Sequence, residues 1–242
     1  MRRFVSTDDW IARIPEEIGR AIMGRMRKIS VAAGAEFSHA GDQVEAFFRV
    51  ETGYLKLISP QEDGRQILIA IYGPGACFAE TALIDRRPLH HSTVAICDTR
   101  VGILGAADFW YFYNHHSEIA DALCRKFSNA ISSQILYREE KATQRLAQRI
   151  AIFFDELARV CGRVQQDGAI EIPLPITQTD LAEHFDVTRQ TIHRELGELR
   201  SMDLITRIPG GWLIKNGQKM AEMAVDAPGP MQARLQFAGQ VQ

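Results

Sequence analysis

Residues 177–215 constrain the fold of this chain more than any other stretch. Thr177 and Asp180 have the three-residue spacing of a capping box, so we expect a short helix to begin directly after Thr177. Asp186 suits the left-handed conformation of a tight turn, and Thr188 can cap a second helix. The apolar residues that would pack the two helices together are Leu181, Val187, Ile192, Leu196 and Leu199. The pattern predicts a helix-turn-helix whose second helix enters the major groove of DNA.

The second helix is followed by two short apolar segments, 204–207 and 212–215, on either side of Pro209-Gly210-Gly211, and these predict a two-stranded wing. Arginine can pair with guanine and glutamine with adenine, so the predicted base contacts are Arg189, Gln190 and Arg194. His193 is a candidate for a further contact, to a base or to a phosphate. The predicted phosphate contacts, which position a protein without reading sequence, are Thr179, Thr188, Thr191 and Lys215.

Charge gives this interpretation no help. The chain has 28 Lys+Arg against 30 Asp+Glu, and its net charge is -2. Two alternatives therefore stay open: a helical hairpin whose arginines are solvated surface, and a scaffold that binds protein instead of DNA. The order of caps, turn and apolar positions favours DNA.

The first half of the chain has a different pattern. Between residues 29 and 110 glycines separate short segments rich in β-branched and aromatic residues, which predicts a β sandwich or barrel. Residues 62–65 form a suitable hairpin turn. Before the strands, residues 8–28 carry an apolar side chain at every fourth position and predict a helix, with Pro15 in its first turn.

Residues 115–140 contain no Gly or Pro and predict one long amphipathic helix. Its apolar stripe consists of Ile119, Leu123, Phe127, Ile131 and Ile135. The helix is long for one small barrel to cover, which favours pairing with a second copy of the chain over packing on its own barrel. The predicted organisation is a β domain at 1–114, a dimerisation helix at 115–140, a DNA-binding domain at 141–219 and a disordered tail at 220–242.

Composition excludes several classes of protein. No apolar run approaches the roughly 18 residues that span a membrane, and the first residues lack the apolar core of a signal peptide. The cysteines are scattered, with no CxxC pair, which argues against a zinc ribbon; they are Cys77, Cys97, Cys124 and Cys161. We expect reduced, mostly buried thiols in a cytoplasmic protein.

The order of β domain, long helix and winged helix-turn-helix resembles the Crp/Fnr family of bacterial transcription regulators. Residues 188–194 look like the family's recognition-helix signature, and residues 50–56 and 72–78 are similar to its β-roll turns. The resemblance implies an α+β fold with an N-terminal double-stranded β-helix (a β roll, or jelly roll) that senses a signal. It also implies a homodimer on double-stranded DNA with an inverted-repeat operator, RNA polymerase as a further partner, and no enzymatic activity.

The family's cyclic-AMP branch holds its ligand with a Gly-Glu-Leu segment and a later Arg-Ser/Thr-Ala. Here Glu80 and Ser92 match, whereas His91 takes the place of the arginine and Ala79 that of the glycine. The candidate effector residues are Glu80, Thr81, His91, Ser92, Thr93 and, on the long helix, Gln134. Loss of the guanidinium removes the bidentate phosphate contact, so ordinary cyclic AMP is not the expected effector. No cofactor is assigned, and another small molecule or nucleotide, or no effector, stays open.

Two alternatives involve a metal. A haem sensor could take an axial ligand from Cys77 or from a histidine, namely His39, His90, His91, His115 or His116. A cupin-like metal-binding enzyme needs His-x-His and a downstream Glu, but the chain has the adjacent pair His90-His91. An iron–sulphur sensor needs clustered cysteines near the N-terminus, and none precedes Cys77.

Overall fold

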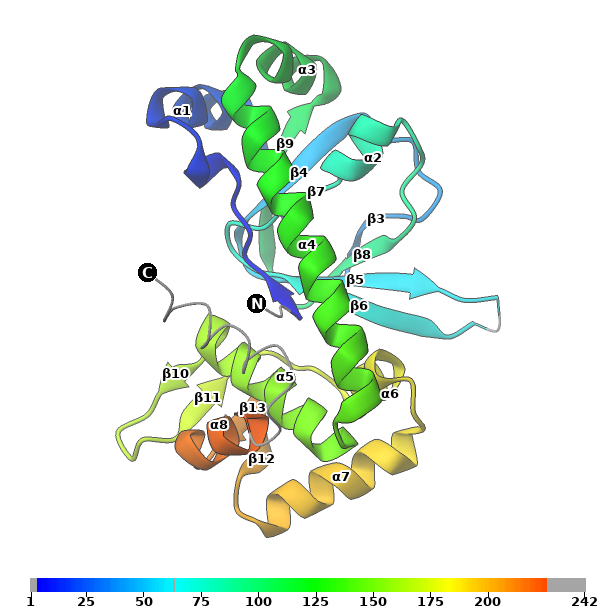
Figure 1. Ribbon diagram of the computed structural model, residues 1–242, viewed down its shortest axis with the longest axis vertical. Coiled ribbons are helices and arrows are strands. Elements are labelled where there is room, and N and C mark those ends of the chain that lie inside the picture. Colours follow the sequence, from blue (N-terminus) through cyan, green and yellow to red (C-terminus); the bar gives the residue numbers. More distant parts are fainter. Residues whose placement is uncertain (1–3, 63, 226–242) are drawn as a thin grey trace, which may run out of the picture. The chain divides into compact units, whose positions relative to one another are not determined.

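The computed structural model describes residues 4–62 and 64–225 (Figure 1). They form two compact units, one reaching to Ile131 and the other beginning at Ser132.

The first unit is built on two β-sheets whose side chains share one core. One sheet has the strand order β1-β6-β5-β8-β3 and the other β2-β9-β4-β7. The strands are β1 (Val5–Ser6), β2 (Arg27–Val31), β3 (Glu36–Ser38), β4 (Ala46–Thr52), β5 (Leu55–Pro60), β6 (Gln66–Tyr72), β7 (Cys77–Phe78), β8 (Ser92–Ala95) and β9 (Thr99–Gly105). All pairs are antiparallel except β1 with β6. This arrangement is the β roll that the resemblance implies.

The turns of the roll follow local chemistry. Strands β5 and β6 form the predicted hairpin, in which Pro60 pairs with Gln66 and Gly64 adopts a φ of 82°. Gly53 also has a φ of 82°, and a Cβ there would lie 2.5 Å from Thr99 Oγ1. Only glycine fits this close approach.

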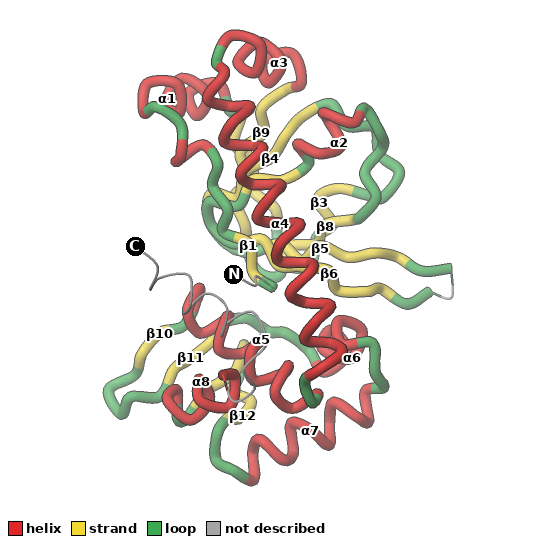
Figure 2. The backbone as a smooth tube through the Cα atoms, in the orientation of Figure 1, coloured by secondary structure: helices red, strands yellow, loops and turns green. Residues whose placement is uncertain are grey.

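Short helices lie around the strands of the roll (Figure 2). They are the short 3-10 helix Ile11–Arg13, α1 (Glu16–Arg25), α2 (Glu80–Asp85) and α3 (Ala106–His115). The prediction of one helix over 8–28 is only partly right: Pro15 caps α1, and the chain from Arg27 forms strand β2. The pairing of β2 with β9 is a long-range contact that the four-residue pattern does not reveal.

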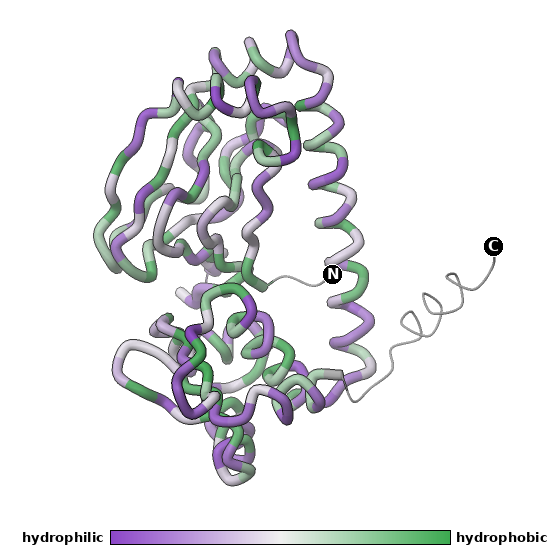
Figure 3. The backbone as a smooth tube through the Cα atoms, turned by 90° about the vertical axis from the view of Figure 1, so that its left-hand side faces the viewer, coloured by the Kyte–Doolittle hydropathy of each residue, from purple (hydrophilic) through white to green (hydrophobic). Residues whose placement is uncertain are grey.

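The long helix α4 spans Ser117–Thr143, close to the predicted 115–140. Its stripe divides into two parts. Ile119 and Leu123 are buried in the core of the roll, whereas Ile131 is 62% and Ile135 52% exposed. Figure 3 shows hydrophilic and hydrophobic stretches alternating along this helix. The helix ends at Thr143 and the chain is extended at Arg145, so α4 is separated from the helix that follows.

The second unit contains the predicted helix-turn-helix and wing. Its helices are α5 (Leu146–Cys161), α6 (Gln178–Phe185), α7 (Arg189–Ser201) and α8 (Gly217–Val225). Its sheet has the order β10-β11-β13-β12, formed by β10 (Arg163–Val164), β11 (Ile170–Ile172), β12 (Ile205–Ile208) and β13 (Gly211–Ile214). The core is aromatic: the ring centroids of Phe154 and Trp212 are 5.0 Å apart, and those of Phe153 and Phe185 are 6.0 Å apart.

The prediction of a disordered tail over 220–242 is wrong for its first residues, because α8 reaches Val225. Met220 is only 1% exposed, so packing orders this segment. The remainder of the predicted tail, 226–242, lies outside the described residues.

The cysteines are all free thiols, as expected, but the expectation that they are mostly buried is wrong. Cys77 is buried and Cys97 and Cys161 are intermediate, while Cys124 is exposed on α4. Packing therefore does not account for Cys124.

In the described part of the chain, no helix is both long and apolar enough to cross a membrane.

Candidate nucleic-acid interface and effector region

Local hydrogen bonds fix the helix-turn-helix. Thr177 Oγ1 accepts from the backbone N–H of Asp180 at 3.0 Å, and Asp180 Oδ2 accepts from the N–H of Thr177 at 2.9 Å. Asp186 then turns the chain with a φ of 57°. Thr188 Oγ1 accepts from the N–H of Thr191 at 3.1 Å and starts α7. The capping residues predicted from the sequence therefore set where each helix begins.

A basic groove lies between the start of α6, one face of α7 and the wing, with a volume of about 430 Å³. Three of the predicted DNA-contacting residues line it: Thr179, Arg189 and His193. Arg200 and Arg207 line it as well. Positive side chains around a helix N-terminus suit a phosphate backbone, because the backbone N–H groups and the helix dipole also attract anions.

Arg200 and Arg207 were not among the predicted contacts. Arg200 lies eleven residues after Arg189, or about three helical turns, so periodicity could have placed it on the same face. Arg207 is held differently. Its Nη1 donates to the carbonyl of Ile176 at 2.5 Å, and its guanidinium lies 4.9 Å from the centroid of the Trp212 ring. Nothing in the local sequence indicates this arrangement.

The other predicted DNA contacts lie outside this groove. Gln190 and Arg194 are exposed, one turn apart on α7. Arg194 Nη2 is 2.8 Å from Glu195 Oε1, and this hydrogen bond raises the pKa of the arginine. Lys215 Nζ pairs with Asp203 Oδ1 at 2.5 Å. The Thr188 and Thr191 hydroxyls bond to each other at 2.9 Å.

The candidate effector residue Glu80 is engaged within the protein. It is 2% exposed, and its Oε1 accepts from Trp10 Nε1 at 2.8 Å and from Lys126 Nζ at 2.7 Å. A carboxylate that already has two donors is poorly placed to receive a ribose hydroxyl. Lys126 also donates to the carbonyl of Cys77 at 2.5 Å, so α4 is tied to the roll at this point.

The remaining effector candidates are dispersed. Ser92 and Thr93 are buried: Ser92 Oγ accepts from the N–H of Ala40 at 3.0 Å, and the Thr93 hydroxyl lies 2.7 Å from that of Ser38. Thr81 and, on α4, Gln134 are exposed. His91 is half-buried; burial and then the neighbouring His90 lower its pKa. An imidazole with a lowered pKa is neutral at pH 7 and does not replace the charge of an arginine.

Aromatic side chains fill part of the roll interior. Tyr72 stacks on Phe78 with ring centroids 4.8 Å apart, Phe48 lies 5.2 Å from Phe78, and Phe37 lies 4.9 Å from Phe48. Burial, and then the charge of Glu80, raises the pKa of Tyr72, so this phenol stays neutral. Ala79, which precedes Glu80, adopts a φ of 74° that is unfavourable for any residue with a Cβ.

Comparison with known proteins identifies both halves of the chain. A family model described as a cyclic nucleotide-binding domain matches residues 28–116, and one described as a Crp-like helix-turn-helix domain matches residues 144–223. The chain belongs to the Crp/Fnr family. It is a DNA-binding transcription regulator of the Crp/Fnr type.

Two curated relatives illustrate the similarity of this Crp/Fnr regulator to known proteins. It is 21% identical to a CRP-like cAMP-activated global transcriptional regulator of Mycobacterium tuberculosis, with 84% of this chain and 91% of the relative covered. It is 23% identical to the cyclic AMP receptor protein of Thermus thermophilus, with 87% of this chain and 93% of the relative covered.

Solved structures share the fold. A CRP/FNR-family transcriptional regulator from Thermus thermophilus superposes with a TM-score of 0.69 at 24% identity, with 84% of this chain and all of that chain covered. The matched families do not favour the cupin-like or haem-sensor alternatives. Among the described residues, no group of three or more His, Cys, Asp or Glu side chains is arranged to hold a metal ion.

Proposed function

We propose that this Crp/Fnr regulator acts as a homodimer joined along α4 and bound to an inverted-repeat operator. The observation that carries the proposal is the exposed apolar side of α4, where Ile131 is 62% and Ile135 52% exposed. Side chains four residues apart lie on one helix face, and a second copy of the same helix would cover them. A two-fold pairing would present two recognition helices to half-sites about 34 Å apart.

In this proposal α7 supplies the sequence reading. Gln190 and Arg194 are exposed one turn apart and would reach base edges, together with Arg189 and His193. Thr179, Thr188, Thr191 and Lys215 would contact phosphates, as would Arg200 and Arg207 in the basic groove.

The protein would work in the cytoplasm, where it meets DNA and RNA polymerase. Its family consists of transcription regulators, which are not typically enzymes, and we propose no catalytic activity.

We infer further that ordinary cyclic AMP is not the effector. Glu80 is satisfied by Trp10 and Lys126, and His91 supplies no positive charge at neutral pH. If the regulator responds to a signal, the ligand must bind the DNA-competent and incompetent states with different affinity.

The dimer is tested by replacing the two exposed isoleucines. Sedimentation of Ile131→Asp/Ile135→Asp should give a monomer where the parent chain gives a dimer, and selection from a randomised DNA pool should no longer yield a palindrome. Val164→Asp is the matched control, because Val164 is 76% exposed but lies on β10. A dimeric double variant would overturn the assignment of the interface.

The effector inference needs a separate titration. Cyclic AMP and cyclic GMP should release no saturable heat and leave DNA selection unchanged. Saturable binding that sharpens DNA selection would show that His91 can serve in place of the arginine.

A further inference from the structure

The roll has a cavity whose wall includes Ser38, and the Ser38 hydroxyl lies 2.7 Å from that of Thr93, a candidate effector residue. Its volume is about 560 Å³, within the range of small-molecule sites. None of the candidate effector residues lines it. Strands β2, β3, β4 and β9 form the walls, with the loop before β4 and Leu89.

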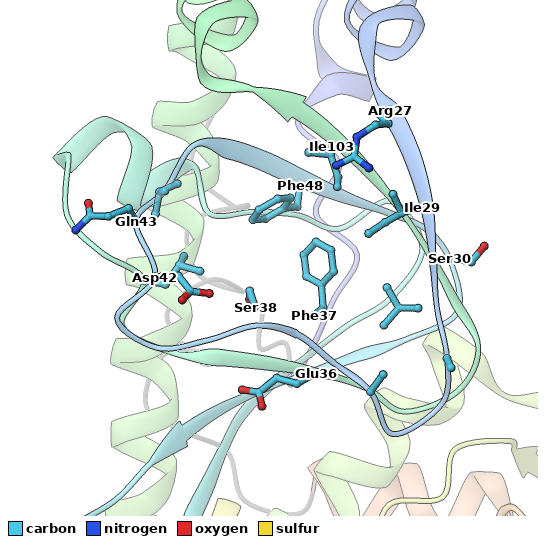
Figure 4. Close-up of a pocket in the computed structure, with 15 residues that line it drawn as sticks. Arg27, Ile29, Ser30, Glu36, Phe37, Ser38, Asp42, Gln43, Phe48 and Ile103 are labelled. Carbon is cyan, nitrogen blue, oxygen red and sulfur yellow. The ribbon is translucent and has the colours of Figure 1, made fainter.

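The interior of this cavity is apolar. Phe37 and Phe48 face it with their rings edge to face, and Ile29 and Ile103 line the adjoining wall (Figure 4). Phe37, Phe48, Ile29 and Ile103 are all only partly buried, so their apolar surface remains accessible. A ligand that covered these side chains would gain the free energy of removing apolar surface from water.

One cation stands at the edge of this apolar surface. Arg27 pairs with Ile103 across β2 and β9, and Figure 4 shows its side chain beside Ile103 and Ile29. Within residues 4–62 and 64–225, the structure gives the exposed Arg27 guanidinium no hydrogen bond or ion pair. Lys28, the next residue, does not line the cavity, and its Nζ lies 3.5 Å from Glu51 Oε2.

The acidic residues of the cavity lie on its other rim (Figure 4). His39 Nε2 is 3.3 Å from Glu36 Oε2, and His39 Nδ1 is 3.5 Å from Asp42 Oδ2. Asp42 Oδ2 also accepts from the N–H of His39 at 2.9 Å. Both carboxylates thus have a partner on the protein, whereas Arg27 has none in the part of the chain described.

We propose that this cavity binds a small amphipathic organic acid, with an aliphatic or aromatic body against Phe37, Phe48 and Ile103 and one carboxylate on Arg27. The guanidinium fork suits a carboxylate because two parallel N–H groups can donate to its two oxygens. The inference concerns binding at this cavity and does not depend on the proposed dimer or operator.

The test is a calorimetric titration of the full chain with octanoate, 3-phenylpropionate, octanamide and octylamine. We expect saturable binding of the two carboxylates, with octanoate bound about tenfold or more tightly than octanamide. Arg27→Gln should remove this preference for the carboxylate, and Arg27→Lys should restore part of it. Lys28→Gln, which removes a charge from the neighbouring residue, should leave the affinities unchanged.

A cavity-filling variant provides a second criterion. Ile103→Trp places a large ring against the phenylalanines and should abolish binding of every probe, with a thermal melt confirming that the roll is folded. Three results would overturn the proposal: no saturable binding of either carboxylate, tighter binding of octylamine than of octanoate, or carboxylate binding that survives in Arg27→Gln and in folded Ile103→Trp. DNA selection by the same samples reports separately on the proposed regulator.

Discussion

Lys126 Nζ lies 2.7 Å from Oε1 of Glu80, and this ion pair joins α4 to the segment that resembles the family's cyclic-nucleotide contact. The side chain of Lys126 is 13% exposed and that of Glu80 only 2%. Trp10 donates to the same oxygen. Glu80 therefore acts as an anchor for the long helix and for the N-terminal segment.

Lys126→Met should destabilise the first unit strongly. Removing one partner of a buried pair leaves the other charge without compensation and costs about 3–5 kcal/mol. The free energy of unfolding of the first unit in urea measures the effect. Adding Glu80→Gln should recover part of the loss, because it removes the orphaned charge. Arg125→Met is the control, since Arg125 pairs with Asp121 at the exposed surface; an equal loss in both variants would refute the anchoring role.

Ala79→Gly should stabilise the roll. A φ of 74° costs a residue with a Cβ about 1–2 kcal/mol that glycine does not incur, and the greater freedom of glycine in the unfolded chain cancels about half. We expect a net gain of about 0.5–1 kcal/mol in urea denaturation. Gly53→Ala is the opposite case. The added Cβ would lie 2.5 Å from Thr99 Oγ1 at a residue with a positive φ, so this substitution should destabilise the roll. A gain for Gly53→Ala would contradict the geometry of this turn.

The lowered pKa of His91 predicts a dependence of stability on pH. The unfolded chain takes up the proton at about pH 6.5, whereas the folded chain resists it until a lower pH. The free energy of unfolding should therefore be unaffected by this group above pH 6.5 and should fall as the pH drops below it. Urea denaturation at pH 7.5 and pH 5.5 should show a smaller difference for His91→Gln than for the parent chain. His115→Gln, at an exposed position, should retain the full difference.

Substitutions in α7 should separate base reading from phosphate contact. Arg194→Ala should weaken binding to the selected operator about tenfold and relax the preference at one base pair. Arg200→Gln should weaken binding to operator and random DNA alike. It should also reduce the slope of log affinity against log salt concentration by about one, the loss of one phosphate contact. Titrations at several salt concentrations measure both effects, with Arg163→Ala on β10 as control. Equal losses on both DNAs for Arg194→Ala would count against a base contact.

The sequence by itself determined the elements that depend on neighbouring residues. Thr177 with Asp180, the turn at Asp186 and the cap at Thr188 act within a few positions, so their spacing predicts the helix-turn-helix directly. The periodicity of α4 and the glycine turns of the roll are equally local. The order of these segments along the chain then carried the resemblance to the Crp/Fnr family.

Only the tertiary structure decided which side chains are available. Glu80 matches a ligand-binding motif in sequence, yet it is satisfied by Trp10, 70 residues away, and by Lys126, 46 residues away. Likewise, Ile131 has the same periodic position as Leu123, but only Leu123 meets the core of the roll. Local sequence specifies how a segment folds because its hydrogen bonds close within one or two turns. Whether a polar or apolar side chain is left for a ligand depends on long-range packing, which brings together residues that have no fixed spacing along the chain.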